Sequence, residues 1–364
     1  MQNKIKIVCI INSLALGGAE KLLLELIQKI DKDRFDISVC TVNGAGPLLL
    51  EFEKLGITLK IFQKKAKLDL GVIWQIYGFL KEIKPDIVHT HLFAGDTWGR
   101  IAAFLARVPV IISTEHNINF DENWLKKIIK LILSWFTDKI IVVSRGVKDY
   151  SIKVEKINPQ KLEVIYNGID LNKFGFRGYK PIETGRNINA VIVARLEKQK
   201  GHEYLLGAMP VIIKKYPNFV LNIVGTGFLL NDLKVQATNL GIINKIVFWE
   251  QQQDIEKILS KMDLFILPSV WEGLGIAIIE AQAVGLPVLA SNIGGIKELI
   301  ENEITGLLFE PQSSEAIFKS IDDLLSTPEL AKKLVENAYQ QVQEKFTIEK
   351  MVKNYSDLYL DLIK

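Results

Sequence analysis

The chain has 364 residues, of which 48% are hydrophobic and 24% charged, so it is long enough for two domains of ordinary size with well-filled cores. A formal net charge of +3 is too small to indicate a nucleic-acid partner, and two cysteines, Cys9 and Cys40, give no disulfide framework and fit a reducing cytoplasm. No apolar run reaches the roughly 18–20 residues of a membrane span, and no small-residue cleavage site follows the short apolar run Ile5–Ile11, so we expect a soluble or peripheral protein.

The first elements predict a parallel sheet without a dinucleotide fingerprint. Ile5–Ile11 is apolar on both faces, as a central parallel strand requires, and a loop with Gly17 and Gly18 leads from it into a helix over residues 21–30. These glycines can bring backbone amides against a ligand phosphate, although a simple tight turn is the commoner explanation. There is no G-x-G-x-x-G pattern, and the next strand, residues 35–42, ends at Asn43 rather than at an acid that would hold a ribose. Both absences argue against a nicotinamide-dependent enzyme.

Strand-like runs alternate with helical patterns through the rest of the first half, which predicts a parallel sheet covered on both faces. We expect strands at residues 57–62, 86–90, 110–113, 139–143 and 161–166, and helices at 70–83, 96–106, 123–136 and 145–151. Ligands on such sheets collect at the carboxyl ends of the strands.

Polar residues follow several of these predicted strands, and three of the four histidines are among them. The groups are His89-Thr90-His91, Thr114-Glu115-His116-Asn117, Ser144-Arg145 and Asn167-Gly168-Ile169-Asp170. A metal site of His89, His91, Glu115 and His116 is one interpretation. No helical histidine pair and no cysteine ligand accompanies them in the sequence, so we predict no metal.

The segment over residues 121–136 combines tryptophans with lysines. Its lysines at positions 126, 127 and 130 share one side, and Trp124, Leu131 and Trp135 can line an apolar face. A basic amphipathic helix with tryptophans can lie in a membrane interface, and Lys64, Lys65 and Lys67 would add positive charge. A surface helix that packs its apolar residues on the sheet and solvates its lysines is the commoner explanation and the one we expect. Contact of the basic side with an anionic membrane is a hypothesis.

A second series of strands and helices begins after a polar stretch with proline and glycine over residues 179–187, which we predict to be the linker between two domains. Strands are expected at residues 188–194, 220–224 (followed by Gly225-Thr226-Gly227) and 245–249. Arg195 leaves the first of these strands, and Lys200 follows at the entry to a helix. Two cations placed there can clamp a diphosphate, the arginine by its fork and the lysine as a point charge. A solvated basic loop is the alternative.

The most informative stretch is a βαβ unit late in the chain. A buried strand over residues 262–268 leads through a turn with Gly273 and Gly275 into a helix over residues 276–284, and another strand starts at residue 288. The glycines allow backbone amides at the helix N-terminus to approach an anion. Glu272 on the turn and Glu280 in the helix are poor phosphate ligands, because like charges repel, but they suit sugar hydroxyls beside a phosphate. An ordinary βαβ unit with a surface glutamate and a helix glutamate is the alternative.

Together these residues resemble the retaining glycosyltransferases of family 4, which have the GT-B fold. The resemblance spans nearly the whole chain: Gly17-Gly18-Ala19-Glu20, Asp86-Ile87-Val88-His89-Thr90-His91, Ser113-Thr114-Glu115-His116, Val142-Val143-Ser144, Tyr166-Asn167-Gly168-Ile169-Asp170, Ala194-Arg195-Leu196 with Lys200-Gly201, Val224-Gly225-Thr226-Gly227, Pro268-Ser269 with Glu272 and Glu280-Ala281, and Gly285-Leu286-Pro287-Val288. It implies two Rossmann-like doubly wound parallel-sheet domains facing across a cleft. The acceptor-side domain would cover residues 1–178, with a C-terminal helix at 347–364 packing back on it, and the donor-binding domain residues 188–346.

The resemblance also implies roles for individual residues. Arg195 and Lys200 would hold the donor diphosphate, and Glu280 the ribose hydroxyls. Glu272 and the amides of Gly273, Leu274, Gly275 and Ile276 would face the donor sugar and phosphates, and His116 would sit beside the reacting anomeric centre. Gly17, Gly18, Asn167 and Gly225 would complete the donor site. One departure is Trp249-Glu250-Gln251, where the family usually has a glycine near the nucleotide base.

The expected function is therefore retaining transfer of a sugar, of hexosyltransferase type, from a nucleoside-diphosphate donor to a glycan or lipid-linked glycan acceptor in cell-surface polysaccharide synthesis. The predicted catalytic residues are His116, Arg195, Lys200 and Glu272. Cations and helix amides neutralise the leaving diphosphate, so no metal or other cofactor is expected. The alternatives are a GT-B sugar-nucleotide epimerase or phosphorylase, an NAD-dependent oxidoreductase, and a non-catalytic subunit. We expect the protein in the cytoplasm or at the inner face of the membrane.

Overall fold

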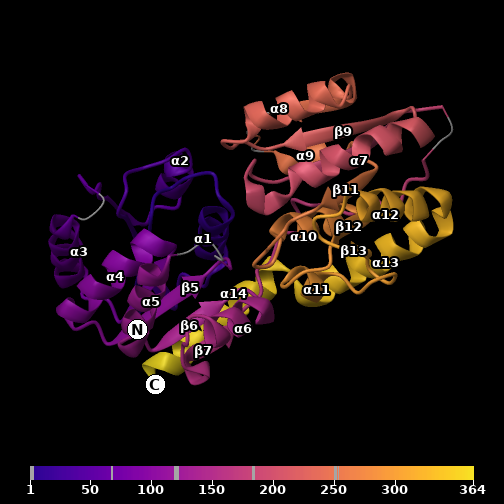
Figure 1. Cartoon of the computed structure of the whole chain (residues 1–364). Helices are drawn as coiled ribbons and strands as arrows, with labels where there is room; N and C mark the ends of the chain where they lie inside the picture. The colour runs from indigo at the N-terminus through magenta and orange to yellow at the C-terminus, as the bar shows by residue number, and fades with distance from the viewer. Residues whose placement is uncertain (1–3, 67–68, 119–122, 183–184, 250–251, 253) are drawn as a thin grey trace. The chain divides into compact units, whose positions relative to one another are not determined.

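The computed structural model describes residues 4–66, 69–118, 123–182, 185–249, 252 and 254–364. The chain forms two compact units: Met1–Gly168 together with Ile348–Lys364, and Ile169–Thr347 (Figure 1). Residues 169–178, which we had placed in the first domain, belong to the second unit. The linker over residues 179–187 stays a prediction, and Glu183 and Thr184 within it lie outside the described residues.

The first unit has a seven-stranded parallel sheet in the order β3-β2-β1-β4-β5-β6-β7. The strands are β1 (Ile5–Ile11), β2 (Phe35–Thr41), β3 (Thr58–Ile61), β4 (Ile87–His91), β5 (Val110–Glu115), β6 (Lys139–Val142) and β7 (Leu162–Val164). The helices are α1 (Gly18–Lys29), α2 (Leu49–Glu53), α3 (Leu70–Ile83), α4 (Phe93–Ala106), α5 (Trp124–Trp135), α6 (Arg145–Lys153) and α14 (Ile348–Ile363). The strand order reverses between β1 and β4, which is where ligands bind in such sheets.

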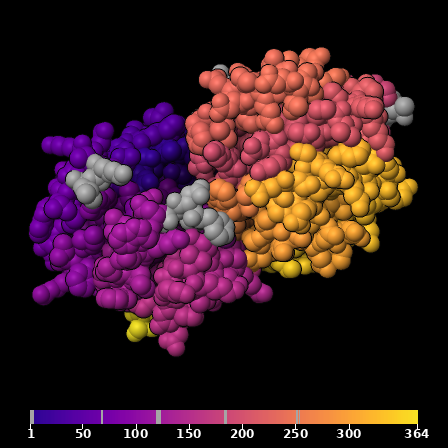
Figure 2. Space-filling view, viewed as in Figure 1, coloured from indigo at the N-terminus to yellow at the C-terminus, as the bar shows by residue number. Residues whose placement is uncertain are grey.

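The apolar strands of this unit are buried between layers of helices. One core cluster joins Val8 of β1 and Val88 of β4 to Ile76 of α3 and Ala102 of α4. Helix α14 returns from the far end of the sequence and packs beside α1. In the space-filling view its yellow end lies at the edge of the indigo-to-magenta first unit (Figure 2).

The second unit has a six-stranded parallel sheet in the order β10-β9-β8-β11-β12-β13, which reverses between β8 and β11. The strands are β8 (Ile188–Val193), β9 (Phe219–Val224), β10 (Ile246–Trp249), β11 (Leu264–Leu267), β12 (Val288–Ser291) and β13 (Leu307–Phe309). The helices are α7 (His202–Lys215), α8 (Leu230–Asn239), α9 (Ile255–Leu259), α10 (Ile276–Val284), α11 (Ile296–Leu299), α12 (Ser314–Ser326) and α13 (Pro328–Lys345). The prediction of two doubly wound parallel-sheet α/β domains is confirmed.

Within the described part of the chain, no helix combines the length and the apolar character needed to cross a bilayer.

Candidate functional site

In the second unit, the loops that follow β8 and β11 meet at the point where the strand order reverses. The Val270 amide donates to the Gln199 carbonyl at 2.7 Å. The Gln199 side chain, which is buried, donates to the Trp271 carbonyl at 3.0 Å. These two bonds fix the loop that carries Lys200 against the loop that carries Glu272.

Lys200 and Glu272 form an ion pair between these loops, and Ser269 Oγ donates to the same carboxylate oxygen, Glu272 Oε2, at 3.2 Å. Their side chains are only 14% and 9% exposed, so the pair is largely desolvated. Two of the predicted catalytic residues, distant in sequence, are thus brought into contact. An anion bound at this position can replace Glu272 as the partner of Lys200.

Arg195 lies on the same loop as Lys200 but points to solvent. Its side chain is 60% exposed and donates to Glu197 Oε1 at 2.9 Å. An exposed pair of this kind is worth about 0–1 kcal/mol, so Arg195 can leave it for a diphosphate at little cost.

Two glycines let the loops of this site approach neighbouring backbone. Gly201 has φ +64°, and a Cβ there would lie 2.0 Å from the Pro268 carbonyl oxygen. Gly225, a predicted donor-site residue, has φ +143°, and a Cβ there would lie 2.1 Å from the Ala194 carbonyl oxygen. The packing of the loops against each other therefore excludes any side chain at either position.

The N-terminus of α10 lies at the end of the same turn. Gly275 is its N-cap, and no side chain caps the helix, so its first amides are available to an anionic ligand. Gly273 and Leu274 are buried within the turn. Glu280 lies four residues after Ile276, on the same face of the helix and half-buried.

The departure from the family pattern at Trp249-Glu250-Gln251 follows β10. Trp249 Nε1 donates to Asn222 Oδ1 at 3.0 Å, whereas Glu250 and Gln251 lie outside the described residues.

In the first unit, the predicted phosphate contact at Gly17 and Gly18 lies at the start of α1. The carboxylate of Glu20, a buried residue in the first helical turn, folds back over Gly17, where a Cβ would lie 2.2 Å from Glu20 Oε2. A carboxylate there suits the positive end of the helix dipole. The phosphate contact stays a prediction, and it requires Glu20 to move. Asn167, also a predicted donor-site residue, is buried near the end of this unit.

Three histidines line up across the carboxyl ends of β4 and β5. His91 Nδ1 lies 3.2 Å from His116 Nε2, and the rings of His89 and His91 are 4.1 Å apart. His89 is bonded at both ring nitrogens, to Tyr359 OH of α14 and to Thr114 Oγ1, each at 2.7 Å. Burial lowers the pKa of His89 to about 3 and that of His116 to about 4, and it holds the pKa of His91 well below its usual value. His116 is therefore neutral at pH 7 and can exchange hydrogen bonds with a sugar hydroxyl without adding charge.

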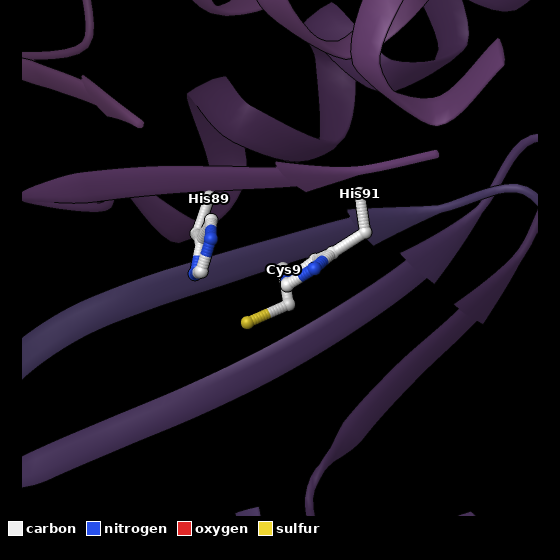
Figure 3. Close-up of side chains that lie close together, drawn as sticks. All are labelled: Cys9, His89 and His91. Carbon is white, nitrogen blue, oxygen red and sulfur yellow. The ribbon is translucent and has the colours of Figure 1, made fainter. Parts of the chain in front are cut away.

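Cys9 lies beside His89 and His91 (Figure 3). The sequence did not reveal this neighbour, and our prediction of no metal assumed that no cysteine lies near the histidines. The register of β1 against β4 pairs Cys9 with His89, and the ligand atoms of the three residues lie within 4.8 Å of one another. Both nitrogens of His89 already have partners, and burial raises the pKa of the Cys9 thiol to about 12. The cluster therefore has the character of a neutral polar core, and the absence of a metal stays a prediction.

The expected solvation of the α5 lysines is wrong for Lys130, which is buried with 3% exposed. Its Nζ donates to Glu115 Oε2 at 3.1 Å and to Glu155 Oε1 at 2.9 Å. Burial alone would raise the pKa of Glu115, but Lys130 and Arg100 hold it below its usual value. Because Glu115 directly precedes His116, this ion-pair network anchors the end of β5 to α5.

Comparison with known proteins identifies the family of the chain. Residues 180–341 match the family model described as glycosyl transferases group 1, and residues 16–173 match that of glycosyltransferase family 4. A UDP-Gal:alpha-D-GlcNAc-diphosphoundecaprenol alpha-1,3-galactosyltransferase of Escherichia coli is 32% identical over 381 residues, which cover 99% of this chain and 98% of the relative.

Two solved structures are similar along their whole length. A glycosyltransferase from Rickettsia africae has a TM-score of 0.84 at 26% identity, covering 100% of this chain and 99% of that one. Anabaena Alr3699/HepE in complex with UDP-glucose has a TM-score of 0.86 at 21% identity, covering 98% of this chain and 100% of that one, and at this identity the likeness shows the fold alone.

Proposed function

The chain belongs to glycosyltransferase family 4, and from that premise we propose that it transfers a hexose, with retention of anomeric configuration, from a uridine diphosphate sugar to a lipid-linked glycan. The observation that carries the proposal is the meeting of Lys200 with Glu272 beside the uncapped N-terminus of α10. The comparisons give no support to an epimerase, a phosphorylase or an oxidoreductase.

The donor proposal rests on chemistry and on a relative. A lysine, an exposed arginine and a helix N-terminus without a side-chain cap together suit a diphosphate. The E. coli relative is named for UDP-Gal.

The proposed reaction replaces one bond at the anomeric carbon by another on the same face of the sugar. The bond from this carbon to the diphosphate oxygen breaks, and a bond to the acceptor hydroxyl oxygen forms. The hydroxyl proton passes to the departing phosphate. Lys200, Arg195 and the α10 amides neutralise the charge that develops on the diphosphate. Each such hydrogen-bond donor contributes on the order of a hundredfold to a thousandfold in rate. We propose that no divalent metal is required, because these groups already supply the positive charge.

Glu272 and Glu280 have a different proposed role, as acceptors for hydroxyl groups. When Lys200 turns to the diphosphate, Glu272 is released to accept a hydrogen bond from the donor sugar, and Glu280 does the same for the ribose. His116, from the first unit, would lie beside the anomeric centre. As a neutral imidazole it would form a hydrogen bond with a sugar hydroxyl, while Lys200 and Arg195 neutralise the negative charge of the diphosphate.

The acceptor and location follow from the E. coli relative, whose name specifies a diphosphoundecaprenol-linked sugar as its acceptor. Such an acceptor is held in a membrane, so we propose that the protein works at the inner membrane face in the synthesis of a cell-surface polysaccharide.

A donor panel tests the proposal. The protein is incubated with uridine, guanosine and adenosine diphosphate sugars, with and without a lipid-linked sugar acceptor, and the released nucleoside diphosphate and the product linkage are measured. Thermal stabilisation by the same panel reports binding independently of turnover. We expect acceptor-dependent UDP release and an α-linked product from an α-configured donor. An inverted linkage, or no transfer from any donor, would contradict the proposal.

A further inference from the structure

Helix α5 exposes its apolar side, contrary to our expectation that this side would pack on the sheet. Trp124 and Trp135 are each 72% exposed, and Leu125, Ile128 and Ile132 are between 41% and 50% exposed. At about 100° per residue, these five positions fall within about 100° of one another around the helix. We call them the α5 strip.

The opposite side of α5 is the buried one. It carries Leu133 and Ser134 together with Lys130, which is held by Glu115 and Glu155. The two buried carboxylates therefore fix the rotation of α5, because turning the α5 strip inward would remove Lys130 from both of them.

The apolar surface continues from α5 onto the neighbouring helix α4. Phe104 and Leu105 near its end are exposed, and the Phe104 ring lies 4.9 Å from that of Phe136, which follows α5. Lys161 Nζ donates to the carbonyls of Ser134 at 2.7 Å and Trp135 at 3.0 Å, which fixes the end of α5. The exposed apolar residues of α5 and α4 are thus neighbours, unlike the single, scattered apolar residues of an ordinary surface, and the end of the helix that carries them is fixed.

We propose that the α5 strip, with Phe104 and Leu105, docks on a phospholipid membrane. A tryptophan at each end with aliphatic residues between them suits the boundary between headgroups and acyl chains, where the indole ring is wetted at its N–H. The helix carries no carboxylate, and its two partly exposed lysines are Lys126 and Lys127, of which Lys127 borders the α5 strip. An anionic surface is therefore favoured over a neutral one. With 12 residues the helix is about 18 Å long, too short to span a bilayer and suited to lying in its surface.

This placement also bears on the acceptor, and in that respect it rests on the proposed function. Lys130 links the inner side of α5 to Glu115, next to His116. The docked surface and the end of β5 are thus separated by about one helix diameter, roughly 10 Å. A lipid-linked acceptor can reach the end of β5 while its lipid stays in the bilayer.

The test compares two double variants of the full chain. Trp124→Ser with Trp135→Ser removes the ends of the α5 strip. Val211→Ser with Val235→Ser, at exposed positions of α7 and α8 in the second unit, is the matched control. Binding is measured by co-sedimentation at low salt with vesicles of equimolar phosphatidylcholine and phosphatidylglycerol, and with vesicles of phosphatidylcholine alone.

We expect wild-type protein and the control to bind, more tightly to the anionic vesicles, and the tryptophan variant to bind about tenfold or more weakly. Equal binding by the two variants, or no binding by wild-type protein, would overturn the proposal. So would light scattering that shows a wild-type dimer dissociated by the tryptophan substitutions, because the α5 strip would then be a self-association surface. Transfer to a short-chain, water-soluble acceptor is measured in parallel, since its absence would refute the proposed function and leave the vesicle result standing.

Discussion

Lys200 and Glu272, 72 positions apart in the sequence, share a largely buried ion pair at the reversal of strand order in the second unit. Glu272 thereby binds the ammonium group of Lys200, to which we assign the binding of the donor diphosphate. The ion pair holds the lysine side chain in place, and we expect the donor diphosphate to replace Glu272 as its partner.

Replacement of Lys200 by alanine is expected to lower kcat/KM for transfer by on the order of a hundredfold or more, because one stabiliser of the leaving diphosphate is lost. Lys198→Ala, at an exposed position of the same loop, is the matched control and should retain activity. Steady-state kinetics with the preferred donor measure both, and thermal melting checks that both variants are folded. Near-wild-type activity of folded Lys200→Ala would show that the diphosphate lies elsewhere.

Two variants distinguish the role of the Arg195 guanidinium from that of its ion pair with Glu197. Arg195→Ala should reduce transfer by on the order of tenfold to a thousandfold while leaving the free energy of unfolding within about 0.5 kcal/mol of wild type, because its ion pair is exposed. Glu197→Ala breaks the same pair but keeps the guanidinium, so transfer should be unchanged. Kinetics and urea unfolding of both variants provide the test, and equal losses of activity would indicate that the pair itself matters.

Stability should fall as the pH drops below about 6.5. Burial lowers the folded-state pKa of His89 to about 3 and that of His116 to about 4, so the unfolded chain takes up protons first. The stability that depends on neutral histidines is fully present above pH 6.5 and is lost progressively toward pH 4. Unfolding by urea between pH 7 and pH 5 measures the slope, which His89→Gln should reduce. A slope of zero in wild-type protein over this range would contradict the assignment.

Lys130→Met should destabilise the protein by about 3–5 kcal/mol, because Glu115 and Glu155 would remain buried without their cation. Lys127→Met, three positions earlier on the same helix and partly exposed, should have a much smaller effect. Adding Glu115→Gln and Glu155→Gln to Lys130→Met should recover part of the loss. Urea unfolding of the four proteins tests this, and equal effects of the two lysine substitutions would refute the buried network.

The parts of the fold that were predictable are those encoded locally. Apolar strands such as Ile5–Ile11 and the glycine-bearing turn before Ile276 carry their structure in a few adjacent residues. Lys200 and Glu272 could be assigned to one site, because both follow strands that end at the same edge of a sheet, but their direct ion pair was not predicted.

The parts that were missed depend on distant partners. Amphipathicity showed that α5 has two sides, but Glu115 and Glu155, from other elements, decide that Lys130 is on the inner one. The contact of Cys9 with His89 depends on the register of β1 against β4, which no local pattern specifies. The position of Glu20 over Gly17 was available from its place in the first turn of the helix, and it was overlooked.

The hydrogen bond between Tyr359 and His89 means that the first unit cannot complete its folding until α14 has been synthesised. Helix α14 follows the whole second unit in the chain, so a ribosome that adds about 5–20 residues per second completes the first unit on the order of ten seconds after its last strand has emerged. During that interval His89 lacks its phenol partner, and the face of the sheet that α14 covers is open to chaperones. The second unit has its whole sequence available before the first, although it starts later.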